Sequence, residues 1–390
     1  MNKTLTLLAC VSAITATTGI TDSASACGGC FAPTGSPTVV TRHQMAVSMS
    51  PEETTLWDQI EYAGNPEDFV WVLPVRDGAP VALADNAFFE ALEQQTRITL
   101  QAPNPPSTFC FDPCGGFLAG DSRGGADAGA AMDAGVTIHH QAAIGPYETV
   151  TIGSEDPAAL VAWLRGNGYA VPDAILPTIT HYTDQGMDFA VLRLSPNFGV
   201  NQMQPVRVTM PGMNPTFPLR MVAAGVEGKV GLELYVFAEG RYGPMNFQGV
   251  EVDRAAITYD WNAGTFNYDA LYANAAATAE GRVWVTEYAQ QLDSYSISYY
   301  ESYDPDTGER HTAAVDYEVV TRHLPNPYLT RLTADMPAVH LTEDLVLGAH
   351  MGEDLGNFIN VTRELNRARD VTCPTECNDP YGSGGAGGWR

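Results

Sequence analysis

The feature that most constrains the fold of this chain is a long series of strand-type segments with few helical ones between them. These segments are rich in β-branched and aromatic residues, and several alternate apolar with polar positions, which predicts strands. The segment 68–75, DFVWVLPV, is almost wholly apolar and is typical of a strand buried on both faces. Strands are predicted over residues 39–49, 54–64, 68–75, 136–153 (two strands), 188–195, 204–210, 217–225 and 229–240, and a long hairpin over 294–320.

Three segments instead have helical character. Asp85 is a candidate N-cap for a helix over 85–95, and further helices are predicted over 154–166 and 172–186. Runs of strands broken by a few helices predict an α+β fold that is β-rich, with mixed but mainly antiparallel sheets and a few packed helices.

The N-terminus has the pattern of an export signal. Lys3 precedes a short apolar segment, which ends at Ala24-Ser25-Ala26, the small-x-small pattern that signal peptidase cleaves. We expect residues 1–26 to be removed, which makes Cys27 the first residue of the mature chain and leaves a lipid anchor at Cys27 as an alternative. Because no later segment reaches the roughly 18 apolar residues that span a bilayer, we expect no transmembrane segment in the mature chain. The expected location is the periplasm, the outer surface or the medium.

Composition indicates how the mature chain is organised. Residues 27–371 are predicted to form one large β-rich domain, and 101–135, rich first in Pro and Cys and then in Gly, Ala and Asp, are predicted to be an insertion. Residues 372–390 form a Cys-containing, Gly-rich tail. The formal net charge of −26 repels phosphate backbones and argues against nucleic-acid binding. The acidity fits solubility, cation binding or a salty habitat.

Six cysteines remain after loss of the signal, in three close pairs. An even number of cysteines in an exported chain predicts disulfides, and pairing between clusters would constrain the unfolded chain most. Zinc binding is an alternative, but thiolate ligands need a reducing compartment, and no cluster has an adjacent histidine. A thioredoxin-like dithiol would need its C-x-x-C at a helix N-terminus after a strand, whereas Cys27 and Cys30 are expected at the mature N-terminus with no strand before them. The disulfide candidates are Cys27, Cys30, Cys110, Cys114, Cys373 and Cys377.

No motif assigns a catalytic, cofactor-binding or metal-binding residue. The sequence has no G-x-S-x-G elbow, no H-E-x-x-H and no phosphate-binding loop. Four tyrosines, at 295, 299, 300 and 303, are either an exposed aromatic ridge for glycans or peptides or ordinary strand packing, and we favour packing.

Six segments follow one another along the chain in this order: ACGGCFAP, WDQIEYAGNPEDFVWVLPV, LVAWLRGNGYAVP, QGMDFAVLRLS, MQPVRVTMPGMNPTFPLRMVAAG and YLTRLTADMPAVHLTEDLVL. This ordered set resembles an exported bacterial family known as domain of unknown function 2330. The resemblance covers Ala26 to Leu347 and implies an extracytoplasmic protein without an established activity, so it transfers no catalytic residue. Many relatives carry a C-terminal membrane segment, which this chain is not expected to have.

Together these observations favour an exported cell-envelope protein, stabilised by disulfides, that binds an envelope or extracellular ligand or has a structural role. We lean against an enzyme and assign no cofactor. The first alternative is a secreted hydrolase whose site is built from scattered acids. The second is a periplasmic dithiol oxidoreductase.

Overall fold

The computed structural model describes residues 30–31, 39–63, 70–104, 141–153, 156–166, 171, 173–196, 198–199, 202–223, 228–304 and 308–367. The predicted signal, most of the predicted insertion and the predicted tail lie outside these residues. So do Cys27, Cys110, Cys114, Cys373 and Cys377, and only the backbone of Cys30 is described. The disulfides therefore stay a prediction.

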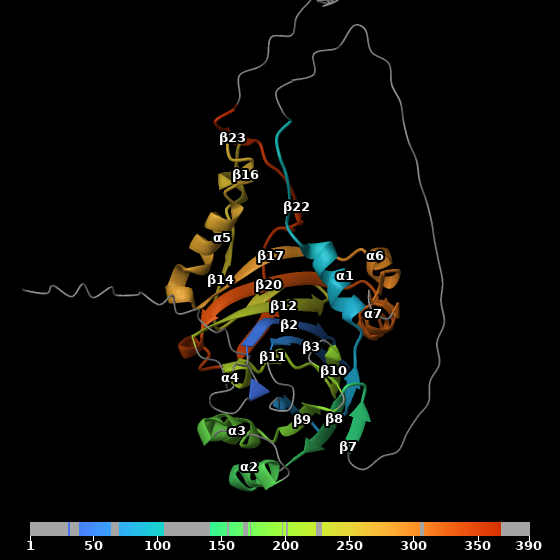
Figure 1. Cartoon of the computed structure of the whole chain (residues 1–390). Coiled ribbons are helices and arrows are strands. Elements are labelled where there is room, and N and C mark those ends of the chain that lie inside the picture. The colour runs from blue at the N-terminus through green and yellow to red at the C-terminus, as the bar shows by residue number, and fades with distance from the viewer. Residues whose placement is uncertain are drawn as a thin grey trace, which may run out of the picture.

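The predicted fold class is confirmed. The protein is strand-rich, with several mostly antiparallel sheets and seven α-helices among the described residues. The largest sheet has eight strands in the order β14-β17-β20-β12-β2-β3-β10-β5 and forms the centre of the molecule (Figure 1). Its strands are β2 (Val39–Met49), β3 (Glu53–Ala63), β5 (Val81–Leu83), β10 (Val206–Pro211), β12 (Lys229–Ala238), β14 (Gln248–Glu251), β17 (Val283–Gln291) and β20 (Tyr328–Pro337).

Two of the pairings in this sheet are parallel. β12 runs parallel to β2, with Leu232 opposite His43, and antiparallel to β20, with Tyr235 opposite Arg331. β14 also runs parallel to β17 at one edge. The sheet is therefore mixed but mainly antiparallel, as predicted.

Alternating side chains give the eight-stranded sheet two apolar faces. On one face Leu234 and Leu332 pack beneath a three-stranded sheet with the order β11-β21-β13 and the short helix α4. On the other face Tyr235 and Trp57 pack against three helices. The covering elements are β11 (Thr216–Phe217), β13 (Tyr242–Pro244), β21 (Leu345–Ala349), α4 (Leu219–Ala223), α1 (Asn86–Thr96), α6 (Ser294–Ser298) and α7 (Ala314–Thr321).

A five-stranded sheet with the order β1-β4-β9-β8-β7 packs against the β3–β10 end of the large sheet. Its strand β4, which lies between β1 and β9, is buried along its whole length, as the apolar segment predicted. Two helices cover its outer face, at the bottom of Figure 1. The elements are β1 (Cys30–Phe31), β4 (Val70–Val75), β7 (Gln141–Ile144), β8 (Tyr147–Ile152), β9 (Asp188–Leu194), α2 (Pro157–Gly166) and α3 (Leu176–Thr183).

An arm rises from the opposite end of the large sheet, beyond β17 (Figure 1). We use "the arm" for β15 (Thr258–Asp260), β16 (Thr265–Phe266), α5 (Tyr268–Ala276) and β23 (Arg363–Leu365). Beside it, β6 (Thr99–Gln101) pairs in parallel with β22 (Phe358–Asn360), and the two units share an apolar cluster. Short 3-10 helices cover Asp173–Ile175, Arg254–Ala256, Thr278–Gly281 and Ala338–His340.

Two local predictions are wrong. Of the strand predicted over 217–225, only Phe217 lies in a strand, and Leu219–Ala223 is helical, which lets Leu219, Met221 and Val222 all be buried. The long hairpin predicted over 294–320 is reduced to the short strands β18 (Glu301–Tyr303) and β19 (Arg310–Thr312), between α6 and α7. Asp293 explains the start of α6, because its carboxylate accepts a hydrogen bond from the amide of Tyr295.

Candidate functional site

A cavity of about 500 Å³ lies where the arm meets the eight-stranded sheet. We call it the cleft. Its floor contains Glu287 of β17 and Arg331 of β20, so the central sheet supplies two of its charged groups. One wall comes from the end of α1 and from β6, and the other from the arm. The wall residues are Arg97, Ile98, Leu100, Gly264, Thr265, Phe266, Tyr268 and Asp269.

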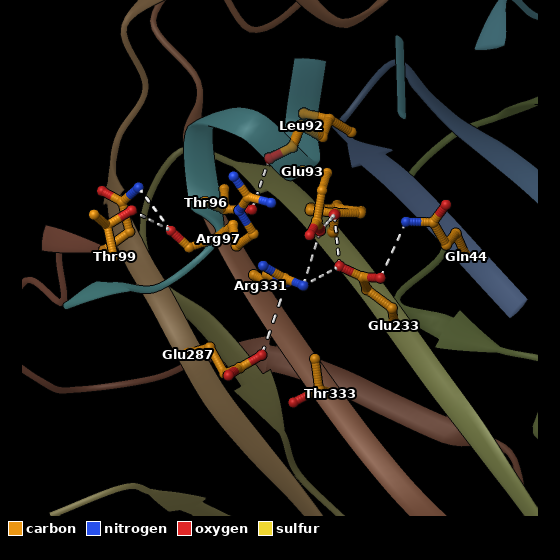
Figure 2. Close-up of polar contacts among 12 residues, drawn as sticks. Gln44, Leu92, Glu93, Thr96, Arg97, Thr99, Glu233, Glu287, Arg331 and Thr333 are labelled. Atoms are coloured by element: carbon orange, nitrogen blue, oxygen red, sulfur yellow. Dashed lines mark hydrogen bonds and ion pairs between the residues drawn. The ribbon is translucent and has the colours of Figure 1, made fainter. Parts of the chain in front are cut away.

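Arg331 is the centre of the charged cluster in Figure 2. Its Nη2 lies 2.5 Å from Oε1 of Glu233 and 2.9 Å from Oε2 of Glu93, and its Nε lies 3.9 Å from Oε2 of Glu287. The residue is only 8% exposed. Three carboxylates from three different elements therefore surround one buried guanidinium.

The cluster continues into the sheet through Glu233. The hydroxyl of Tyr235 donates to Oε1 of Glu233 over 2.6 Å, and the amide of Gln44 donates to Oε2 over 3.0 Å. Burial raises the pKa of Tyr235 well above its usual range, and the charge of Glu233 adds to the effect. Burial alone would lower the pKa of Arg331, but the surrounding acidic groups outweigh it and the pKa is raised. Arg331 is thus held as a permanent cation.

A β-bulge brings Glu287 to the floor of the cleft. The register between β17 and β20 shifts between Thr286 and Tyr288, so Glu287 is an extra residue in the ladder. Glu287 faces Arg331, and Tyr288 packs with Tyr235 on the same face of the sheet. The side chains of two consecutive residues therefore point to the same face of the sheet, which a regular strand would not allow.

The last turn of α1 positions Glu93 above Arg331. The side chain of Thr96 donates to the carbonyl of Leu92 over 2.7 Å, and the backbone amide of Arg97 donates to the carbonyl of Glu93, so this turn is tightly closed (Figure 2). The start of α1 is capped by Asp85, as predicted.

The arm is anchored to the floor by two tyrosines of α5. The hydroxyl of Tyr268 donates to Oε1 of Glu287 over 2.8 Å, and that of Tyr272 donates to Oγ1 of Thr333 over 2.9 Å. Burial, reinforced by the charge of Glu287, raises the pKa of Tyr268. The tyrosine therefore stays protonated and remains a hydrogen-bond donor at neutral pH.

Two other buried polar features lie away from the cleft. His43 Nε2 and Asp58 Oδ1 are 2.5 Å apart in the core, where burial raises the pKa of Asp58. A smaller cavity of about 60 Å³ adjoins Tyr182, whose hydroxyl donates to Asp344 over 2.7 Å. Neither feature combines ligand-sized space with charged groups, which the cleft does.

The residues of the cleft differ from those that the sequence emphasised. The cysteine candidates lie outside the described side chains, and the favoured packing of the tyrosines at 295, 299, 300 and 303 is wrong for three of them. Tyr295, Tyr299 and Tyr303 are 70%, 71% and 56% exposed. Sequence reasoning missed Glu233, Glu287 and Arg331. The available signal was that each is a charged residue inside a mainly apolar strand.

The part of the chain that the structure describes has neither a metal-binding cluster nor a membrane-spanning helix. No set of three or more His, Cys, Asp and Glu side chains among the described residues is arranged to hold a metal ion. Within the same residues, no helix has the length and apolarity needed to cross a membrane.

Comparisons with known proteins give one informative result. The curated proteins contain no match. The crystal structure of baculovirus P35 matches with a TM-score of 0.34 and 8% identity, over 81% of this chain and 98% of that one, a likeness too low to carry an argument. A family model described as an uncharacterized protein conserved in bacteria (DUF2330) matches residues 21–345. Since that match covers most of the sequence, the chain belongs to this bacterial family, DUF2330.

Proposed function

We propose that this protein is an exported cell-envelope protein that binds a small ligand in the cleft. The observation that carries the proposal is the cavity of about 500 Å³ above Arg331 and Glu287. This volume is within the range of small-molecule sites, which combine apolar walls with a few oriented polar groups. Ile98, Leu100 and Phe266 supply such walls here.

The arrangement of residues at the floor of the cleft suits ligand binding better than hydrolysis. A carboxylate that donates a proton in a hydrolase must be able to reach the scissile bond and give the proton up. Oε1 of Glu287 already accepts from Tyr268, and Oε2 faces the guanidinium of Arg331. This arrangement suits a fixed hydrogen-bond acceptor.

Export and disulfides are supported by the N-terminal signal pattern and by the six cysteines of the mature chain. Mass spectrometry of the protein recovered from its host cells tests both. We expect a mature chain that begins at Cys27, with all six cysteines oxidised. An intact N-terminus in the cytoplasm, or six free thiols, would contradict this part of the proposal.

Ligand binding is tested by thermal unfolding of the purified protein with three probes: a mixture of neutral oligosaccharides, spermidine, and a mixture of tripeptides. A ligand at ten times its Kd should stabilise the folded protein by about 1.4 kcal/mol. Thr265→Trp should block the cleft, because Thr265 is exposed on its wall. Thr278→Trp, exposed outside the cleft, is the matched control.

At least one probe should raise the melting temperature of the wild type and of Thr278→Trp, but not of Thr265→Trp. If no probe does so, or if Thr265→Trp responds like the control, the cleft is not a binding site.

A further inference from the structure

The floor of the cleft has a hydrogen-bond donor and an acceptor that are close together but do not bond to each other. Nε of Arg331 is buried and has no hydrogen-bond partner among the described residues. Oε2 of Glu287 lies 3.9 Å from it, too far for a hydrogen bond. An unpaired buried N–H is costly, so this pair of atoms is suited to a third group placed between them.

That third group has to accept from Nε and donate to Oε2. A hydroxyl does both, whereas an ammonium only donates and a carboxylate or phosphate only accepts. For an oxygen about 2.8 Å from both atoms, the angle Nε–O–Oε2 would be roughly 90°, which a hydroxyl tolerates. An anion would also meet Glu93 and Glu233, which already surround the guanidinium.

The walls favour a ligand that carries hydroxyls on an apolar ring. Phe266 and Tyr268 of the arm are partly exposed aromatic residues, and Ile98 and Leu100 add aliphatic surface to the lining. Among the lining residues, two arginines balance two carboxylates, so the lining has no net formal charge, while Glu93 and Glu233 beside Arg331 add negative charge that disfavours an anion. A neutral ligand therefore brings no charge that the lining residues would have to pair.

We propose that the cleft binds a neutral carbohydrate, with one sugar hydroxyl shared between Arg331 Nε and Glu287 Oε2 and a sugar ring packed against Phe266 and Tyr268. This inference rests on the proposed function and names its ligand class. Polyamines, peptides and anionic sugars become the competing outcomes of the test.

Isothermal titration calorimetry of the purified protein provides that test. The probes are the tetramers of N-acetylglucosamine, of β-1,4-glucose and of α-1,4-glucose, with spermidine, trialanine and glucose 6-phosphate for comparison. At least one neutral tetramer should bind, and Thr265→Trp should abolish that binding. Arg331→Lys keeps the positive charge but removes Nε, and should weaken binding about tenfold to a hundredfold, the effect of one hydrogen bond to a charged group.

A second variant keeps the test valid if Arg331→Lys does not fold. Phe266→Ala, at a partly exposed position, should weaken sugar binding at least about tenfold through loss of ring packing. Wild-type affinity in folded Arg331→Lys or in Phe266→Ala overturns the carbohydrate assignment.

The remaining outcomes separate the two proposals. If spermidine, trialanine or glucose 6-phosphate binds in a Thr265→Trp-sensitive way and the neutral tetramers do not, the carbohydrate assignment is wrong while the proposed function stands. If no probe binds, both proposals are wrong.

Discussion

Replacing Asp316 with alanine should destabilise the protein by about 4 kcal/mol. Asp316 is 1% exposed and accepts hydrogen bonds from Trp57 Nε1 over 2.8 Å, from Arg207 over 2.6 Å and from the backbone amide of Asp85 over 2.9 Å. Three bonds to a charged acceptor at about 1.5 kcal/mol each sum to about 4.5 kcal/mol. This sum agrees with the roughly 3–5 kcal/mol lost when one partner of a buried ion pair is removed.

Urea unfolding followed by circular dichroism measures this loss. The control is Asp335→Ala, since Asp335 pairs with Lys229 at the surface and should contribute less than about 1 kcal/mol. The same difference in the unfolding free energy for both variants would refute the reasoning. So would a loss below about 1 kcal/mol for Asp316→Ala. Because Asp316 also binds the residue that caps α1, its loss should loosen the helix that carries Glu93.

Three further predictions follow from burial and exposure. Burial raises the pKa of Asp58 above its usual 3.8, so the folded chain keeps this proton at a pH where the unfolded chain has lost it. The unfolding free energy of the wild type, relative to that of Asp58→Asn, should therefore fall as the pH rises from about 4 through the raised pKa. If urea unfolding shows the same change of unfolding free energy with pH for both proteins, the prediction is wrong. Arg331→Met should lower the unfolding free energy measured in urea by about 3–5 kcal/mol, because it leaves buried carboxylates without their cation. The control Arg322→Met, which removes a half-exposed ion pair, should lower it by less than about 1 kcal/mol. Tyr295→Ser with Tyr299→Ser should change the melting temperature by no more than a few degrees, since both rings are exposed, and a larger drop would mean that they pack in solution.

Local sequence patterns predicted most of the longer strands up to residue 240 and the helices α1, α2 and α3, because burial on one or two faces leaves a periodic signal, but they did not predict β17, β20 or the helices α4 to α7. β2 begins and ends where the pattern placed it, and β4 and α1 are within two residues of their predicted bounds. The segment 294–320 failed because tyrosine and serine are common in strands, while the cap at Asp293 selects a helix. In a short segment that has both strand-type residues and a helix cap, the periodicity is too weak to distinguish a strand from a helix.

The cleft could not be predicted in the same way, because its residues meet only through tertiary structure. Glu93, Glu233, Glu287 and Arg331 come from four elements spread over most of the described chain. The isolated charges inside apolar strands indicated buried pairs but not their partners. The bulge that turns Glu287 toward Arg331 depends on the register with β20 and leaves no mark in the sequence.

The parallel pairing of β12 with β2 has a consequence for how the chain folds. Gln44 and Glu233, which bond across this pairing, are 189 residues apart in sequence. During synthesis β2 and β3 can form a hairpin early, but the other edge of β2 stays open until β12 has been made, and the far edge of β12 then stays open until β20 has been made. Contacts of such long range slow folding and leave an unpaired strand edge exposed to other chains. A fragment that ends before β12 should therefore aggregate, and the intact protein should fold only once nearly the whole sequence is available.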